Sequence, residues 1–259
     1  MITKQELIAF EKECEAAFNA GRIRAPLHLS AGNEDQLIEI FQRVKPTDYV
    51  FSTWRSHFHA LLHGVPREQL MAKVLAGESI SINVPERRFY SSAICGGCLP
   101  IALGVAWAEK RRPSGLRCFD CKQVVTHFID QDRYGGCPNC LCFRTEPSLC
   151  HVWCFVGDMA AEMGAFAEAS RYAAHHELPL TIVVEDNGKC VNADTKELWG
   201  GSHNVWVEIS WQDNSPMFRR TTDPITVERY RYQLAWPHMG TGIRVEFPDQ
   251  QPFAPTGGM

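Results

Sequence analysis

Two apolar runs that each end in polar residues constrain the fold of this chain most strongly. The first covers about residues 151–156 and is followed by Asp158, and the second covers about residues 180–185 and is followed by Asn187. Residues 161–176, between the two runs, have the apolar spacing of a helix. A strand–helix–strand unit of this length predicts an α/β fold, with a parallel sheet and helices on both of its faces.

The polar residues at the two strand ends predict a ligand site. Because both strands of a right-handed unit point the same way, Asp158 and Asn187 should face one crevice at the carboxyl edge of the sheet. Gly157 lets a ligand approach the backbone closely, and the helix that begins near Ala161 directs its N–H groups to the same place. These groups suit Mg²⁺ bound to a diphosphate. The alternative is an Asp that caps its own helix, followed later by an Asp-Asn-Gly turn.

The rest of the chain adds helices before this unit and strands after it. Further helices are expected at residues 3–19, 33–43, 66–77 and 96–112. Asn33 is the expected N-cap of the second, and the last is apolar nearly all round and should be buried. Residues 78–95 are expected to be irregular. Strand-like segments follow at residues 204–211, 225–234 and 242–247.

Four cysteines predict a metal site of a different kind. Cys118 and Cys121 form one Cys-x-x-Cys pair, and Cys137 and Cys140 form a second pair after fifteen intervening residues. Two such pairs can supply four thiolates to a tetrahedral Zn²⁺. We expect a structural zinc ribbon over residues 115–147, inserted into one domain formed by residues 1–114 and 148–259. One alternative is that these are unrelated buried cysteines. A second alternative is a ribbon that binds nucleic acid, and the mixed charges of the segment disfavour this second one.

Composition narrows the location and the partners. Eleven cysteines, in a chain whose first residues have neither a signal-peptide nor a transit-peptide pattern, indicate a reducing compartment, so we expect a cytoplasmic protein. The formal net charge of −4 gives no reason to expect nucleic acid or a membrane surface as a partner. The longest apolar run, at residues 98–108, is too short to cross a bilayer.

Several segments together match the motifs of one enzyme family. Four of these segments lie around the two predicted strands. In chain order, they are Gly157-Asp158-Met159, "GAFAEA" at 164–169, "LP" at 178–179 and Glu185-Asp186-Asn187. Upstream lie "HLSAGNE" at 28–34, "DYVFSTWRSHFHALLHG" at 48–64 and "SSAICGGCLPIALGVAWAEKRR" from Ser91. These segments resemble the alpha chains of thiamine diphosphate-dependent first components of 2-oxo-acid dehydrogenases. The likeness covers roughly residues 22–112 and 150–192.

The resemblance implies a site for thiamine diphosphate and Mg²⁺. The implied cofactor-binding residues are Trp54, Arg55, Ala93, Cys95, Gly157, Asp158, Met159, Ala160 and Asn187. Asp158, Asn187 and the main-chain carbonyl of Lys189 would bind Mg²⁺, and Arg55 would grip the diphosphate with its guanidinium. His28 and His57 would act on the substrate carbonyl as catalytic residues. A looser likeness near the end of the chain adds His238 to this catalytic set.

The chain also departs from the family pattern. Met159 stands where the family has its second glycine, and Asp186 stands where it has its first asparagine. Asp186 would add negative charge beside a diphosphate, so we expect it to point away or to hydrogen-bond locally. The zinc ribbon is an insertion. Residues 193–259 would have to complete a domain that is longer in the family.

By resemblance, we expect the diphosphate-binding subunit of an enzyme that decarboxylates a 2-oxo acid. A beta-type partner chain would supply a pyrimidine-binding domain and an activating glutamate, and the substrate would be a small carbonyl compound. One alternative keeps the cofactor but transfers a two-carbon ketol unit, as transketolase does. A second alternative is a non-catalytic binding module in which the zinc ribbon is the working part. The segments "HLSAGNE" and "LP" favour the first function.

Overall fold

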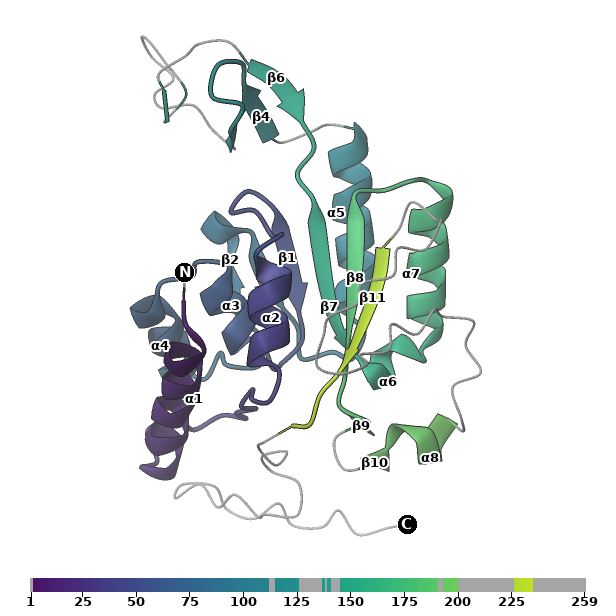
Figure 1. Cartoon of the computed structure of the whole chain (residues 1–259). Helices are drawn as coiled ribbons and strands as arrows, with labels where there is room; N and C mark the ends of the chain where they lie inside the picture. Colours follow the sequence, from purple (N-terminus) through teal and green to yellow (C-terminus); the bar gives the residue numbers. More distant parts are fainter. Residues whose placement is uncertain are drawn as a thin grey trace, which may run out of the picture.

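A six-stranded sheet forms the centre of the molecule (Figure 1). The computed structural model describes residues 2–111, 115–125, 137, 139–140, 145–190, 193–199 and 226–234. Within them the strand order of the main sheet is β11-β8-β7-β1-β3-β2. The strands are β1 (Tyr49–Ser52), β2 (Asn83–Val84), β3 (Phe89–Ser91), β7 (Val152–Gly157), β8 (Leu180–Asp186) and β11 (Thr226–Arg231).

The main sheet is parallel except at one edge. Strands β11, β8, β7, β1 and β3 all pair in parallel, whereas β2 pairs with β3 in the antiparallel direction. Every residue of β8 is buried, and so is β7 as far as Val156. Strands that are covered on both faces need apolar side chains on both, which explains the continuous apolar runs in the sequence. The predicted α/β class is confirmed.

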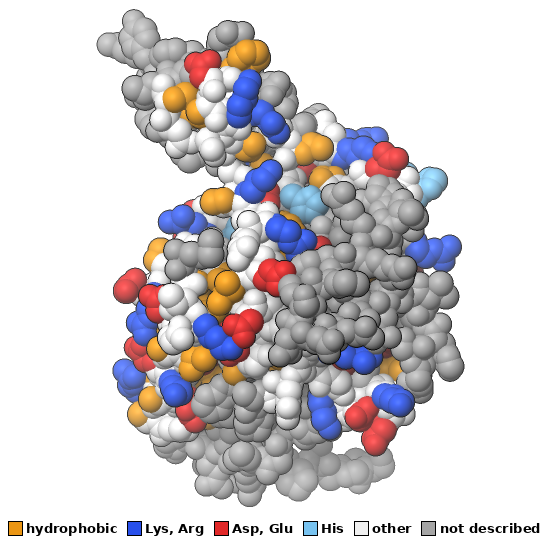
Figure 2. Space-filling model, in the orientation of Figure 1, with side chains coloured by type: hydrophobic (Ala, Val, Ile, Leu, Met, Phe, Trp, Pro, Cys, Tyr) orange, Lys and Arg blue, Asp and Glu red, His pale blue; other side chains and the backbone are white. Residues whose placement is uncertain are grey.

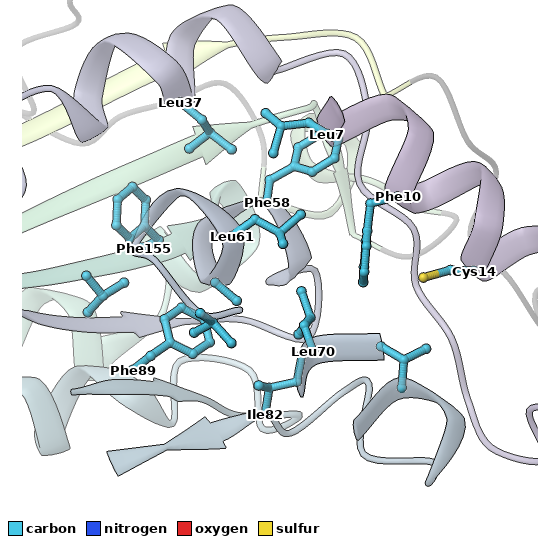
Figure 3. Packing of buried hydrophobic residues seen from close by; sticks show 14 of the residues in the cluster. Leu7, Phe10, Cys14, Leu37, Phe58, Leu61, Leu70, Ile82, Phe89 and Phe155 are labelled. Atoms are coloured by element: carbon cyan, nitrogen blue, oxygen red, sulfur yellow. The ribbon is translucent and has the colours of Figure 1, made fainter. Parts of the chain in front are cut away.

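Helices cover both faces of this sheet. One face packs against α1 (Lys4–Asn19), α2 (Glu34–Phe41), α3 (His57–Leu62) and α4 (Arg67–Leu75), and the other packs against α5 (Cys98–Arg111) and α7 (Gly164–His175). Strand β7 contributes to both cores, because Phe155 points into the first and Cys154 into the second. Figure 3 shows Phe155, Leu37 and Phe58 within the first core. The sheet is therefore held rigidly from both sides.

The structure corrects several expectations about single elements. The four predicted helices outside the central unit are confirmed as α1, α2, α4 and α5, each slightly shorter than predicted. Residues 78–95, expected to be irregular, instead contain β2, β3 and the 3₁₀ helix Pro85–Arg87. The helix expected at 161–176 is α7, and a separate short helix, α6 (Asp158–Ala161), precedes it. The long helix α7 therefore does not begin directly after β7. Only the single turn of α6 lies at that strand end.

The predicted strand segments of the tail have different outcomes. Residues 225–234 contain β11, which pairs in parallel with β8. Residues 204–211 and 242–247 lie outside the described residues. After β8 the chain forms the hairpin of β9 (Lys189–Cys190) and β10 (Ala193–Asp194) and then α8 (Thr195–Trp199), at the same end of the sheet as α6 (Figure 1).

A separate antiparallel sheet lies at the opposite end of the molecule (Figure 1). Its strands are β4 (Gly115–Cys118), β5 (Val124–Val125) and β6 (Thr145–Ser148), in the order β5-β4-β6. Strand β6 leads directly into the start of β7, so this small sheet is attached at the amino edge of the main sheet. Figure 2 shows it projecting from the main body, with positive and negative side chains interspersed over the described surface. Among the described residues, no helix is both long enough and apolar enough to cross a membrane.

Candidate functional site

A cavity opens at the carboxyl edge of the main sheet, where the strand ends predict a ligand site. It contains about 780 Å³ of open space, its mouth included. Its walls come from the ends of β1, β7 and β8, from the segments that follow β1, β3, β7, β8 and β11, and from the loop before α2. Parallel strands end at one edge, which brings residues far apart in the sequence together here. Nine predicted residues line it: Trp54, Arg55, Cys95, Gly157, Asp158, Met159, Ala160, Asn187 and Lys189.

Asp158 brings a buried carboxylate to this cavity. Its side chain is 2% exposed, and its Oδ2 atom has no hydrogen-bond partner among the described residues. Burial raises the pKa of Asp158 and the nearby carboxylate of Asp186 adds to this effect, while the Thr195 side chain acts in the opposite direction. A buried carboxylate oxygen without a partner is costly. A hard cation such as Mg²⁺, bound at Oδ2, would remove that cost.

Asn187 follows β8 and lines the same cavity. Its Oδ1 accepts a hydrogen bond from the N–H of Lys189 at 2.9 Å, and its Nδ2 donates to the hydroxyl of Tyr232 at 3.3 Å. Gly188 has a φ of +70°, the left-handed conformation that lets the chain turn here. The predicted turn is therefore present. It is compatible with a metal site, because a carbonyl oxygen has two lone pairs and only one is used by Lys189.

Asp186, which replaces an asparagine of the family pattern, is paired with β11. Its Oδ2 accepts hydrogen bonds from Arg229 Nη2 at 2.7 Å and from Arg231 Nε at 3.2 Å. Its Oδ1 accepts a hydrogen bond from the N–H of Gly188 at 3.0 Å. Two guanidinium groups neutralise this carboxylate locally. The expectation that Asp186 hydrogen-bonds locally is confirmed.

Arg55 brings positive charge to the cavity wall. Its backbone N–H donates to Thr53 Oγ1 at 3.2 Å, which fixes the turn after β1. Burial lowers the pKa of the Arg55 guanidinium, while Tyr232, Glu185 and Glu11 act in the opposite direction. The group stays charged because an arginine guanidinium keeps its proton throughout the pH range in which proteins are folded. A guanidinium in this position is suited to a phosphate group.

Further polar atoms of the cavity wall lack protein partners. Among the described residues, Ser30 Oγ, Asn33 Oδ1, Ser52 Oγ and Trp54 Nε1 are buried and make no hydrogen bond. Buried polar groups in proteins nearly always have a partner. No atom lies within 4 Å of the position that a Cβ on Gly157 would occupy, so the backbone there is open. The residues present therefore fit a polar, anionic ligand that binds together with a metal ion.

One wall of the cavity holds a buried network that the sequence analysis missed. Glu185 Oε1 accepts hydrogen bonds from Asn33 Nδ2 at 3.0 Å and from the hydroxyl of Tyr230 at 2.5 Å. His59 Nε2 lies 3.2 Å from the same oxygen. Asn33 is the N-cap residue of α2, as predicted, but its side chain makes no capping hydrogen bond and turns to Glu185 instead. The place of Asn33 within the segment "HLSAGNE" was the sequence feature that could have indicated a role at the site.

Two of the predicted catalytic histidines, His28 and His57, are not among the residues that line the cavity. The ring of His28 lies beside that of Trp54, with the two ring centroids 6.2 Å apart. His57 is fully buried in the core, with Nδ1 3.0 Å from Glu11 Oε2 and Nε2 2.9 Å from Ser79 Oγ. Both ring nitrogens of His57 are engaged within the protein, so this arrangement does not support direct contact with a substrate.

Two other predicted residues have different outcomes. Ala93 is exposed and does not line it, although its neighbours Ile94 and Cys95 do. His238 lies outside the described residues.

The four cysteines of the predicted zinc ribbon come together at the far end of the molecule. Their Sγ atoms all lie within 4.8 Å of one another. The Sγ atoms of Cys118 and Cys140 are 3.4 Å apart, and those of Cys121 and Cys137 are 3.6 Å apart. Burial acts to raise the pKa of Cys118, but hydrogen bonds from the backbone N–H groups of Cys121 and Asp120 and from the thiols of Cys140 and Cys121 together outweigh it and lower the pKa to about 6. The donor set fits a soft cation.

Comparison with known proteins places the chain in a family. The family described as "Dehydrogenase E1 component" matches residues 3–197. The "Pyruvate dehydrogenase E1 component subunit alpha" of Porphyra purpurea is 27% identical over 189 residues, and that of Rickettsia prowazekii is 24% identical over 188 residues. Each match covers 69% of this chain and 47% of the relative. The chain thus spans about half the length of these curated relatives.

A solved structure, described as a thiamin diphosphate-dependent enzyme from Mycobacterium smegmatis, also matches. It is 15% identical, with a TM-score of 0.35, and the match covers 64% of this chain and 24% of the other. The assignment rests on the family match, which extends over most of the sequence. The matched range, residues 3–197, includes every residue that lines the cavity except Tyr232. This chain belongs to the dehydrogenase E1 component family.

Proposed function

We propose that the chain is the diphosphate- and Mg²⁺-binding subunit of a thiamine diphosphate-dependent enzyme that decarboxylates a 2-oxo acid. The observation that carries this proposal is the meeting of Asp158, Asn187 and Arg55 in one cavity. Two oxygen ligands and a guanidinium suit a magnesium–diphosphate pair. The E1 family and its relatives named as pyruvate dehydrogenase subunits favour a 2-oxo acid over ketol transfer.

Each part of the cavity wall has a defined task in this proposal. Asp158, Asn187 and the main-chain carbonyl of Lys189 would hold Mg²⁺, and Arg55 would bind the diphosphate. Met159 and Cys95 would line the path of the rest of the cofactor. Thiamine diphosphate supplies the carbon nucleophile that attacks a carbonyl group, a chemistry that no side chain offers. The chain itself contributes binding, orientation and charge.

We also propose that a beta-type chain completes the active site. The relatives are named as alpha subunits, which supports a second subunit. Ile94 lies at the cavity and is 74% exposed, so an apolar side chain is available there for a partner to cover. The partner would bring the pyrimidine-binding domain and the activating glutamate. A small carbonyl substrate would enter where the two chains meet.

Calorimetric titration of thiamine diphosphate with Mg²⁺ tests the cofactor site. We expect saturable binding to the full chain, weakened about 100-fold or more by Asp158→Asn, because this change removes a charged metal ligand. Glu168→Gln changes an exposed carboxylate on α7 and should leave the affinity unaltered. If the wild-type chain bound no cofactor even with its beta-type partner present, the proposed function would be wrong.

A separate proposal concerns the cysteine cluster. Cys118, Cys121, Cys137 and Cys140 would bind a structural Zn²⁺ and thereby fold the inserted segment 115–147, whose small sheet has little core of its own. The retained prediction of a cytoplasmic, reducing location suits free thiolates. Elemental analysis should find one zinc per chain, lost in Cys118→Ser. Zinc content that is unchanged by this substitution would contradict the assignment.

A further inference from the structure

A buried cluster outside the cavity joins helix α1 to two other segments. Glu11 lies in the middle of α1 and is 1% exposed. Its Oε1 accepts a hydrogen bond from the backbone N–H of Ser30 at 3.1 Å, and its Oε2 lies 3.0 Å from His57 Nδ1. His57 Nε2 in turn lies 2.9 Å from Ser79 Oγ. Both carboxylate oxygens and both ring nitrogens therefore have protein partners.

The partners of Glu11 belong to the segments that build the cavity. Ser30 lines the cavity in the loop before α2. His57 is the first residue of α3 and follows Arg55, another lining residue, by two positions. One carboxylate thus connects the loop before α2 with the turn after β1. It also acts on Arg55 through space, where it favours the charged guanidinium against the effect of burial.

A metal site explains this cluster less well. Cys14 Sγ lies within 4.8 Å of the possible ligand atoms of Glu11 and His57. Burial raises the pKa of the Cys14 thiol far above its ordinary range, so the thiol stays protonated, whereas metals bind the thiolate. The oxygen and nitrogen atoms are already bonded to protein groups. The contacts instead resemble those that hold two segments in a fixed relation.

We propose that Glu11 is a positioning residue, which fixes the Ser30 loop and the Arg55 turn relative to each other and so holds the guanidinium in place for an anion. The identity of that anion, a diphosphate, rests on the proposed function, whereas the contacts between the two segments do not. Glu11→Gln keeps the shape and removes the charge. Hydrogen bonds to a neutral acceptor are weaker than those to a carboxylate, so both segments should loosen.

Hydrogen exchange of the full chain tests the positioning without any ligand. We expect Glu11→Gln to speed amide exchange about 10-fold in residues 28–33 and 53–57, because charge-assisted hydrogen bonds are lost there. Exchange in β7 and β8 should not change. The matched control is Glu13→Gln on the same helix, whose carboxylate is 43% exposed and pairs with Arg67. Equal acceleration everywhere, or none in the two segments, would overturn the inference.

Binding of Mg²⁺ and inorganic pyrophosphate, measured by calorimetry on the full chain, tests what this positioning does at the cavity. We expect Glu11→Gln to weaken binding about 10-fold at full stoichiometry, since the guanidinium is less well placed. Fewer sites at unchanged affinity would show a role in folding only and would overturn the inference. A wild-type chain that bound no pyrophosphate, even with its beta-type partner present, would contradict the proposed function. The exchange result would still decide the positioning.

Discussion

The cavity and the Glu11 cluster contain the same kinds of side chains in opposite states. In the cluster, the carboxylate of Glu11 and the ring of His57 use all their polar atoms in contacts with the protein. In the cavity, Asp158 Oδ2 and several neighbouring polar atoms have no partner within the described structure. Hydrogen-bond satisfaction, rather than residue type, separates the two regions. The satisfied cluster is a fixed structural element, and the unsatisfied wall is a site for a ligand.

The largest expected effect follows from breaking the satisfied cluster. Glu11→Ala leaves the N–H of Ser30 and the ring of His57 buried without their partner. We expect a loss of about 3–5 kcal/mol in the free energy of unfolding, as for other broken buried pairs. Chemical denaturation measures it, with Glu13→Ala as the exposed control. A loss no larger than that of the control would erase the distinction between the two regions.

Asp158→Asn should have the opposite sign in the metal-free chain. The wild-type carboxylate is buried without a partner at Oδ2, and a neutral amide of the same shape costs less to bury. We expect a gain of about 1 kcal/mol in unfolding free energy by denaturation, together with the loss of cofactor binding. A clear destabilisation would instead support the alternative in which Asp158 serves only as a helix cap.

A smaller effect concerns the pH dependence of stability. Burial lowers the pKa of His63 and of His151. As pH falls below about 6.5, the unfolded chain takes up protons at these histidines before the folded chain does, so the free energy of unfolding decreases. His63→Gln should reduce the decrease between about pH 7.5 and pH 5.5 by up to about 1 kcal/mol. The exposed His175→Gln is the control, and an equal effect of both changes would contradict this prediction.

The smallest effect is expected at the surface. Lys73 and Glu78 form an ion pair at 2.8 Å, with the Glu78 side chain 50% exposed. Glu78→Gln should change the free energy of unfolding by less than about 0.5 kcal/mol, because water and salt screen such pairs. Thermal denaturation at low and high salt measures it. A change in the free energy of unfolding as large as that of Glu11→Ala would mean that burial does not determine how much these interactions contribute to stability.

Long elements with a strong apolar pattern could be predicted from the sequence. Strands β7 and β8 are buried on both faces and therefore appear as continuous apolar runs, with the helical period of α7 between them. Strand β1 has four residues and β3 has three, too few to show a period. They are strands because β7 lies beside β1 and completes its hydrogen bonds. Tertiary pairing, absent from the local sequence, decides such short elements.

The site was predictable where topology alone determines position. Asp158 and Asn187 meet because two parallel strands end at one edge. Side-chain direction was not predictable in the same way. The side chain of the N-cap residue Asn33 turns inward to Glu185 instead of bonding to the first turn of its helix, and His57 turns into the core toward Glu11. Each direction depends on a buried carboxylate contributed by a distant segment, for which the local pattern holds no information.

Crystallography of the chain with thiamine diphosphate and Mn²⁺ in place of Mg²⁺ tests the central claim most directly. The account predicts an anomalous peak at about 2.0–2.3 Å from Asp158 Oδ2 and Asn187 Oδ1, with the diphosphate between this ion and Arg55. A bound cofactor whose metal lies elsewhere, or a peak at Asp158 without diphosphate beside Arg55, would contradict it.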